Sequence, residues 1–356
     1  LDAAVFDGLA YDAVRATADR YVVVTASITG TGVAMTALLD TNFQATLTLP
    51  HIAEETEYWD TLAFLSNSRP DLLDVVVGGS TTALTPQTSA LYELEGLLPA
   101  TPIEEQAWGR FMAHAADPFS PPSTLSGFEM FVKEGSDGAA LELTHHVAQT
   151  LFIPHVPEET DIFWTGFTFV NPADEPAQAT VYWYTDAGQE LGTTNLTIGA
   201  NSKLKGLMTE LFPEFAGTAQ WGLILADRPL TGIEIYGTYN AGICGLTLPL
   251  EPHTHGILPD VRTGANDWTG IVLTNVTVDD VTVTLELVGS DGQVKDTGTL
   301  TIGAFSRFKA VVGEYFDGIT VADGDYVRFT STGPVVALEA GGDMDRTVMT
   351  ALTGTR

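Results

Sequence analysis

Hydrophobic and polar residues alternate along several short stretches of this chain. In residues 180–184 and 281–287, β-branched or aromatic residues alternate with polar ones, which is the period of two expected for a half-buried strand. A turn of the Asp-Gly type follows each stretch, at residues 186–188 and 291–292, and such turns favour β-hairpins. Breaks rich in Gly and Thr recur about every 8 to 12 residues, as in sandwich folds. The pattern predicts an all-β protein, with a short helical turn within residues 204–212 and another within 308–316.

The same pattern returns with a period of about 105 residues, and a missed repeat would misassign the whole fold. The string Leu-Thr-Ile-Gly-Ala occupies residues 196–200 and again 300–304. Four single-residue landmarks keep the same register: Pro50, Pro154 and Pro259; Trp59, Trp164 and Trp268; Asn67, Asn171 and Asn275; Glu129, Glu234 and Glu339. We therefore expect three complete repeats, at residues 47–150, 151–256 and 257–356, called repeats 1, 2 and 3 below.

The order of motifs in repeat 2 resembles a known kind of protein. Pro154-His155, Trp164-Thr165-Gly166, Asn171-Pro172, Asp186-Ala187-Gly188 and residues 196–200 follow one another. This order resembles the tandem immunoglobulin-like β-sandwich repeats of large exported bacterial surface proteins. The resemblance covers repeats 2 and 3 well and repeat 1 loosely, because Trp59-Asp60-Thr61 lacks the glycine. It implies tandem immunoglobulin-like sandwiches displayed at a cell surface.

Residues 1–46 predict the second half of a further sandwich, called the partial repeat below. Phe6-Asp7-Gly8-Leu9 matches residues 316–319, and residues 21–30 align with residues 334–342. A half-sandwich exposes an apolar face and unpaired strand edges. It could be a boundary fragment, it could be completed by another chain through strand addition, or it could pack on repeat 1. The second alternative predicts self-association, or binding to another surface protein, through Phe6, Tyr21, Val23, Thr25 and Ser27.

Composition restricts the partners and the compartment. The 356 residues contain 15 Lys and Arg against 46 Asp and Glu, a formal net charge of −31, which disfavours nucleic acids and anionic membranes. No apolar run of about 18 residues predicts membrane insertion. The chain starts at Leu1 without a signal-peptide pattern, so we expect a mature exported protein, extracellular or at the cell surface. Cys244, the only cysteine, is expected to be a buried and inert thiol.

Two groups of residues are candidates for metal binding. His253 and His255 flank Thr254, so their imidazoles could meet at one ion. Carboxylates that recur in turns are candidate calcium ligands: Asp323, Asp325, Asp343 and Asp345. Ordinary linker histidines and turn-forming aspartates explain the same residues without a metal. Calcium is the only cofactor that the sequence suggests.

The landmark residues have structural rather than catalytic explanations, because catalytic groups rarely recur once per repeat. Trp is expected to fill each core and Asn to close a turn. The landmark Glu stands on an apolar strand, so it must accept hydrogen bonds, from a turn amide for instance, or be protonated. No nucleophile elbow, phosphate loop or dinucleotide fingerprint is present, and we expect the chain not to be an enzyme.

Two functions remain open. The repeats, their short linkers and the partial repeat favour an exported structural protein, a rod-like surface stalk or an extracellular filament subunit. The alternative is an adhesin or an array of carbohydrate-binding modules, with a glycan as ligand and Trp183 beside Tyr182 or Tyr184 as an aromatic platform. An exposed Trp183 would favour the alternative, and a buried one would count against it.

Overall fold

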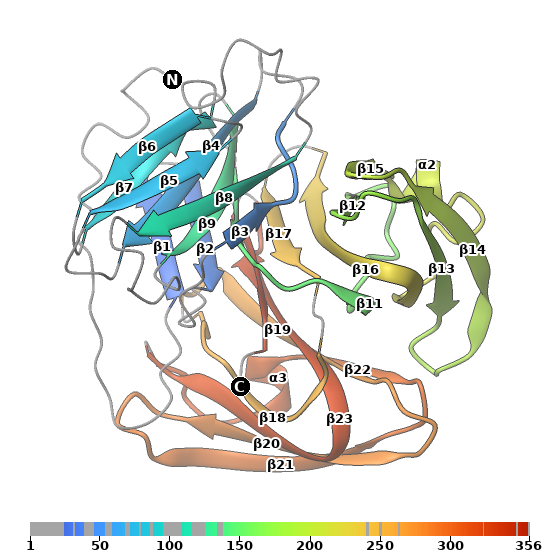
Figure 1. The fold of residues 1–356 in the computed structure, drawn as a ribbon. Coiled ribbons are helices and arrows are strands. Elements are labelled where there is room, and N and C mark those ends of the chain that lie inside the picture. The colour runs from blue at the N-terminus through green and yellow to red at the C-terminus, as the bar shows by residue number, and fades with distance from the viewer. Residues whose placement is uncertain are drawn as a thin grey trace. The chain divides into compact units, whose positions relative to one another are not determined.

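The computed structural model describes most of the chain in detail, and the following account concerns these residues only. They are residues 25–30, 33–38, 46–53, 59–67, 72–77, 80–85, 88–94, 108–115, 125–133, 138–239, 242–248, 251–262, 264–322, 324–346 and 348–354. The chain divides into two compact units, Leu1–His146 (unit 1) and Val147–Arg356 (unit 2). Antiparallel strands dominate both units (Figure 1), and the all-β class is confirmed.

Unit 1 contains two four-stranded sheets and one hairpin. The first sheet has the order β3-β8-β5-β6, and the second has the order β10-β9-β4-β7. Leucines and valines from both sheets form one buried cluster, which is a sandwich-like core. The bounds are β1 (Thr25–Gly30), β2 (Val33–Leu38), β3 (Thr46–Leu49), β4 (Trp59–Asn67), β5 (Leu73–Val77), β6 (Ser80–Leu84), β7 (Ser89–Glu93), β8 (Gly109–Ala115), β9 (Leu125–Lys133) and β10 (Gly138–Glu142).

The hairpin of the partial repeat is formed by β1 and β2, which pair along their whole length. Strand β2 lies beside β10, the last strand of repeat 1. Of the candidate assembly residues, Thr25 pairs with Leu38 and Ser27 with Thr36, whereas Phe6, Tyr21 and Val23 lie outside the described residues. The hairpin therefore has a neighbour within unit 1, as the third alternative for the partial repeat predicts.

Repeat 2 has the same strand order as repeat 1, with two strands fused into one. Its sheets run β11-β16-β13-β14 and β17-β16-β12-β15, so that β16 takes the places of both β8 and β9. The bounds are β11 (Ala148–Ile153), β12 (Phe163–Asn171), β13 (Ala177–Tyr184), β14 (Glu190–Ile198), β15 (Ser202–Leu207), α2 (Met208–Leu211), β16 (Trp221–Thr238) and β17 (Ile243–Thr247). The predicted helical turn is present in α2, whereas residues 204–207 belong to a strand.

Strand β16 changes partners near its middle, and this change joins the two sheets. Residues 221–226 pair with β13, and residues 231–238 pair with β12. Pro229, which has no N–H group to donate, lies between these two segments, opposite a register shift in β11. Proline is tolerated at such irregular positions, and strands that bend or bulge can pass from one sheet to the next. The long strand thus encloses the core of the repeat.

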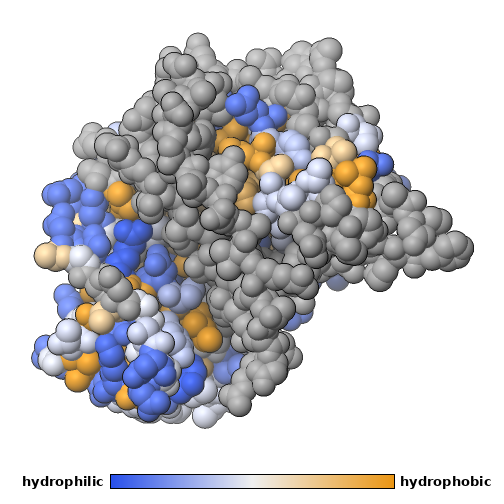
Figure 2. All heavy atoms as spheres, turned by 90° about the vertical axis from the view of Figure 1, so that its left-hand side faces the viewer, coloured by the Kyte–Doolittle hydropathy of each residue, from blue (hydrophilic) through white to orange (hydrophobic). Residues whose placement is uncertain are grey.

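Repeat 3 reproduces this arrangement. Its sheet order is β21-β20-β23-β19-β22, with β18 and β24 pairing with the long strand β23, and Pro334 takes the place of Pro229. The bounds are β18 (His253–Leu258), β19 (Asp267–Asn275), β20 (Val281–Val288), β21 (Val294–Ile302), β22 (Arg307–Val311), α3 (Val312–Tyr315), β23 (Tyr326–Asp343) and β24 (Met349–Thr353). On the face drawn in Figure 2, the coloured side chains are largely hydrophilic, with hydrophobic ones scattered among them.

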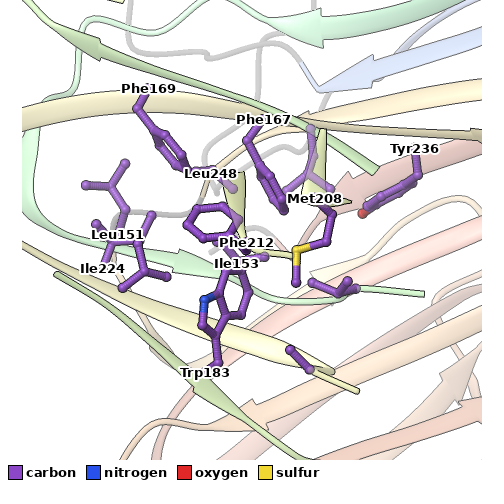
Figure 3. Packing of buried hydrophobic residues seen from close by; sticks show 14 of the residues in the cluster. Leu151, Ile153, Phe167, Phe169, Trp183, Met208, Phe212, Ile224, Tyr236 and Leu248 are labelled. Atoms are coloured by element: carbon purple, nitrogen blue, oxygen red, sulfur yellow. The ribbon is translucent and has the colours of Figure 1, made fainter. Parts of the chain in front are cut away.

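The core of repeat 2 is built around aromatic rings. Trp183 is fully buried, and its ring meets that of Phe212 edge to face at 4.8 Å between centroids (Figure 3). Phe167 lies 5.7 Å from Phe212 in the same manner. Because Trp183 has no exposed surface, the expected aromatic platform is wrong at its central residue. Tyr184 is also buried, and Tyr182 is half-buried.

The landmark Asn closes a turn, as predicted. Asn171 donates from Nδ2 to the carbonyl oxygens of Glu175, Ile198 and Gly199 at 2.8 to 3.2 Å, and its Oδ1 accepts from the amide of Ala173. In repeat 3, Asn275 makes the corresponding set of bonds, and Asn67 in repeat 1 donates to two carbonyls. One buried amide in each repeat therefore joins the end of a strand to a neighbouring turn, and in repeats 2 and 3 it also binds the loop that follows its own strand.

The landmark Trp does not fill the core, contrary to expectation. Trp164 and Trp268 are only half-buried. A β-carbon added to Gly237 would lie 2.7 Å from the Trp164 ring, so that ring covers the glycine at the end of β16. Trp268 donates from Nε1 to the Asp343 carbonyl at 3.2 Å. The indole therefore seals the rim of the sandwich, where its polar atom can find an acceptor.

Candidate functional site

Repeats 2 and 3 meet along a continuous junction within unit 2. Strands β17 and β24, the last strands of the two repeats, lie side by side. Four residues of repeat 3 belong to the buried hydrophobic cluster of repeat 2: Val272, Leu338, Met349 and Ala351. Arg346 places its guanidinium 5.7 Å from the centroid of the Phe163 ring. The two repeats thus share apolar packing and are not independent domains joined by a linker.

Arg307 is the centre of the polar half of this junction. It begins β22 in repeat 3, and its side chain has no exposed surface. Its Nε donates to Asp186 Oδ1 at 2.5 Å, and its Nη1 donates to His155 Nδ1 at 2.9 Å and to the Gln220 carbonyl. The main-chain amide of Arg307 donates to the Asp186 carbonyl at 2.8 Å. One side chain of repeat 3 is therefore bound by three separate segments of repeat 2.

A second cation borders this arrangement on its exposed side. Lys309 Nζ lies 3.1 Å from Asp186 Oδ2 and 3.2 Å from Glu158 Oε1, and half of its side-chain surface is exposed. Gln220 donates to Glu158 and accepts from the Asp186 amide. The hydrogen bonds from Gln220 and Lys309 hold the pKa of Glu158 below its ordinary value, although partial burial acts in the opposite direction. Two cations and two carboxylates thus alternate across the junction.

Aromatic stacking and a tight main-chain approach complete the junction. The Tyr184 ring stacks on Trp221 at 4.4 Å and on Phe305 of repeat 3 at 5.6 Å, and Trp221 Nε1 donates to the Phe305 carbonyl at 3.1 Å. Gly188 has a φ of 78°. A β-carbon on Gly188 would lie 2.4 Å from the carbonyl oxygen of Ala304 in repeat 3. Only glycine fits this turn without displacing repeat 3.

Strands β16 and β17 carry a small group of buried titratable residues close to Arg307. Glu234 and Tyr236 are two residues apart on one face of β16, and Tyr236 pairs with Cys244 across the strands. The His155 ring meets the Tyr236 ring edge-on at 6.0 Å. Neither the Glu234 carboxyl nor the Tyr236 hydroxyl has a hydrogen-bond partner among the described residues.

Burial determines the protonation of this group. It raises the pKa of Glu234 well above the ordinary range, against the opposing effect of Arg307, so burial favours the neutral form of the carboxyl. Burial likewise raises the pKa of Tyr236 and of the Cys244 thiol, and the expected buried, inert cysteine agrees with this position. Burial, Arg307 and Lys309 all lower the pKa of His155 well below 6.5. The imidazole is therefore neutral.

Glu339 is the landmark Glu of repeat 3, at the position equivalent to Glu234. Its carboxylate accepts from the Asp260 amide at 2.9 and 3.2 Å, which confirms the predicted turn-amide partner for this copy. Burial raises the pKa of Glu339 to about 8 even though that hydrogen bond favours the ionised form. Asp260 occupies the landmark position that His155 has in repeat 2. The loop after the landmark proline thus lies over the landmark Glu, with a different side chain in each copy.

The candidate metal ligands lie in separate places. Among the described residues, no three His, Cys, Asp or Glu side chains are arranged to hold a metal ion. Asp325 is buried and forms an ion pair with Lys295 at 2.6 Å, while Asp345 accepts from Asn266 at 2.9 Å. Asp343 accepts from the Val348 amide.

The histidine candidates are on strand β18. His253 is half-buried and pairs with Val335, and His255 is exposed, with its Nδ1 3.4 Å from the hydroxyl of Thr254. Asp323 lies outside the described residues. Metal binding therefore stays a prediction without a described ligand set, whereas the described aspartates have partners within the protein.

Sequence reasoning did not find Arg307. It used His155 as part of the Pro154-His155 motif of repeat 2, and the structure places this residue against Arg307 of repeat 3. The available signal was a difference between equivalent positions, since Arg307 stands where repeat 2 has Lys203. Arginine is preferred over lysine where planar, bidentate and buried pairing is needed. Asp186, its carboxylate partner, was used only as part of a turn motif.

Comparisons with known proteins give no family. No family model and no curated protein sequence matches the chain. A β-glucuronidase 2 of Bacteroides uniformis, covalently bound to cyclophellitol-6-carboxylate aziridine, is 8% identical over 64% of this chain and 26% of that one, with a TM-score of 0.14. A β-glucuronidase of Parabacteroides merdae is 10% identical over 83% of this chain and 36% of that one, with the same TM-score. The chain thus matches about a quarter to a third of these enzymes.

Among the described residues, no helix has the length and apolar character that crossing a bilayer would need.

Proposed function

We propose that the chain is an exported structural protein whose tandem β-sandwich repeats hold one another in fixed orientations, as a surface stalk or an extracellular filament subunit. The observation that carries the proposal is the Arg307 junction. Its side chain is fully buried and is bound by three segments of the preceding repeat. A stalk or filament that transmits force or sets a length needs defined angles between its repeats. An interface of this kind defines such an angle.

The chemistry of the junction supports orientation more than stability. Burying an ion pair costs desolvation that the attraction between the charges only partly offsets. A buried Arg does restrict geometry, because its planar fork accepts few arrangements of acceptors. The shared apolar residues at β17 and β24 supply the attraction. Repeats 2 and 3 therefore act as one rigid body, which is what a structural element requires.

The burial of the expected aromatic platform counts against the adhesin or carbohydrate-binding alternative. Trp183 is fully buried, so it cannot present its face to a sugar ring. Tyr184 is covered by Trp221 and Phe305. The finer expectation of an immunoglobulin-like topology is likewise not confirmed, and we propose only that each repeat is a sandwich of two sheets in the order given above.

The rigidity is tested with spin labels on two exposed strands, Thr193→Cys on β14 and Thr299→Cys on β21, in a Cys244→Ala background. The unaltered junction should give one narrow distance distribution at neutral pH. Arg307→Met should broaden it, and Arg307→Lys should broaden it less, because the charge is kept while the fork is lost. Arg328→Met, which removes an Arg from the partly exposed pair with Glu286, is the matched control. A broad distribution in the parent protein would refute the proposal.

Assembly is tested separately by electron microscopy and light scattering of the full chain and of a chain that starts at residue 43. If the partial repeat completes a neighbouring chain, oligomers or fibres should form and should disappear on truncation. Monomers in both preparations would refute assembly through the partial repeat. That result would agree with the position of β2 beside β10.

A further inference from the structure

The hydrogen bond between Arg307 and His155 constrains the protonation of the histidine by geometry alone. A guanidinium can only donate hydrogen bonds. Arg307 Nη1 lies 2.9 Å from His155 Nδ1, so this nitrogen must carry a lone pair and the ring proton must be on Nε2. A proton on Nδ1 would place two donors against each other, and the contact could not persist.

We propose that the junction between repeats 2 and 3 is proton-operated: it is closed while His155 Nδ1 accepts from Arg307, and it opens when that nitrogen is protonated. The inference deepens the proposed structural function by giving the array a pH-dependent stiffness. It concerns a regulatory property of the same junction, and the rigidity of the array at neutral pH is a separate question.

The charges around His155 oppose its protonation. Arg307 and Lys309 approach from β22, and the carboxylates of Asp186 and Glu158 are already shared with them. Tyr236 meets the ring from β16, Glu234 stands two residues earlier on the same face of that strand, and Cys244 pairs with Tyr236 from β17. Burial raises the pKa of all three groups and so favours their neutral forms. An imidazolium would therefore be an excess positive charge at a site where both carboxylates already have cationic partners.

The sign of the effect follows from the direction of the shift. Burial, together with Arg307 and Lys309, lowers the pKa of His155 in the closed junction, whereas a solvent-exposed histidine has a pKa near 6.5. The open state thus binds the proton more readily than the closed state. Closure is fully favoured above pH 6.5 and becomes progressively weaker as the pH falls below that value. Carboxylate protonation follows at lower pH, because the pKa of Glu158 is itself lowered.

The repeats supply a natural contrast. Repeat 3 has Asp260 where repeat 2 has His155, and the Asp260 amide binds Glu339 instead. In repeat 1 the equivalent His51 contacts the Phe131 ring at 5.3 Å, where repeat 2 has His155 against Tyr236. The arginine partner, however, is specific to the junction of repeats 2 and 3, because the residue equivalent to Arg307 in repeat 2 is Lys203.

The experiment measures the distance between spin labels at positions 193 and 299 of the full chain from pH 8 to pH 5, with circular dichroism on the same samples. The protein with His155 should show a distribution that broadens reversibly with a midpoint below pH 6.5, while the β-sheet signal is retained. His155→Asn should stay narrow over the whole range, because the amide Oδ1 can accept from Arg307 but cannot be protonated there. His255→Asn, which replaces an exposed histidine, should behave like the parent.

Several results would overturn the inference. One is a narrow distribution in the parent protein down to pH 5, and another is equal broadening in His155→Asn. Loss of the β-sheet signal at the same pH in both proteins would indicate general acid unfolding and would also count against it. His155→Lys provides a second test, because its permanent charge should open the junction already at pH 8 and remove most of the pH dependence. If parent and His155→Asn stay narrow throughout, the rigidity claimed under the proposed function survives while the proton-operated junction does not.

Discussion

Gly188 and Gly292 form a matched pair that isolates the contribution of the junction. Both stand in the hairpin turn after the third strand of their repeat, with φ of 78° and 79°. A β-carbon on Gly188 would lie 2.4 Å from the Ala304 carbonyl oxygen across the junction, whereas a β-carbon on Gly292 would have no atom within 4 Å. Gly188→Ala and Gly292→Ala therefore share the local penalty and differ only in the clash with repeat 3.

The magnitudes follow from these two contributions. A non-glycine residue in the left-handed region costs about 1 to 2 kcal/mol, and this cost applies to both variants. At Gly188 the added carbon is roughly 1 Å too close for van der Waals contact, and overpacking of this kind costs about 1 to 3 kcal/mol more. We expect Gly188→Ala to lower the melting temperature of unit 2 roughly 2 to 10 °C further than Gly292→Ala does.

The assay combines calorimetry with the distance between labels at positions 193 and 299. Gly292→Ala should leave the distance distribution unchanged, because its added β-carbon would have no described atom within 4 Å. Gly188→Ala should shift or broaden the distribution as repeat 3 moves away from the added methyl group. Equal melting temperatures together with equal distributions for the two variants would refute the reasoning, since they would mean that the turn and residue 304 are not in contact in solution.

Three further predictions concern two of the landmark residues and the buried Trp183. Asn171→Asp and Asn275→Asp should each destabilise unit 2 by about 2 to 4 kcal/mol, because the carboxylate cannot donate to the three carbonyls now bound; urea unfolding that gives clearly unequal losses would show that the two sites are not equivalent. The raised pKa of Glu339, about 8, implies stability that is fully present below pH 4.5 and is lost as the pH rises to about 8. Glu339→Gln should remove this contribution, which is at most about 5 kcal/mol, so the difference in melting temperature between variant and parent should change between pH 5 and pH 8. A difference that stays constant over this range would contradict the prediction. Trp183→Ala should destabilise unit 2 by about 3 to 5 kcal/mol, and a thermal melt that it leaves unaltered would mean that this ring is not in the core.

The periodic pattern was sufficient for the strand content and for residues whose role is local to one repeat. Asn171 and Asn275 were predicted to close turns because Asn suits that task, and their environments are the same in both copies. Glu339 was expected either to accept hydrogen bonds, from a turn amide for instance, or to be protonated, and the Asp260 amide is its donor. Asn171 reaches its acceptors within 28 residues of chain, and the donor to Glu339 lies 79 residues earlier. In each case both partners belong to one repeat, so the repeat carries this information in its own sequence.

The sequence did not predict the surroundings of residues whose neighbours come from another repeat, or whose burial depends on how a strand bends. Trp164 has a recurring position, yet recurrence fixes only its place in the repeat and says nothing of depth, so its half-burial was missed. The burial of Trp183 was left open, because alternation does not say which face of β13 is covered. Arg307 could not be placed, because its partners lie more than 80 residues earlier in another repeat and arise only from the way in which the two repeats meet.

The difference between equivalent positions carries more functional information than the similarity between them. If repeats 2 and 3 were merely stacked copies, the position of Arg307 would tolerate the lysine that repeat 2 has at 203. A buried guanidinium contributes little net stability when its desolvation is counted, so stability alone does not explain an arginine enclosed by Asp186, His155 and the Gln220 carbonyl. Orientation does explain it, because only one relative placement of the repeats satisfies all three acceptors. Such an interface suits a protein whose function depends on the angle between its repeats.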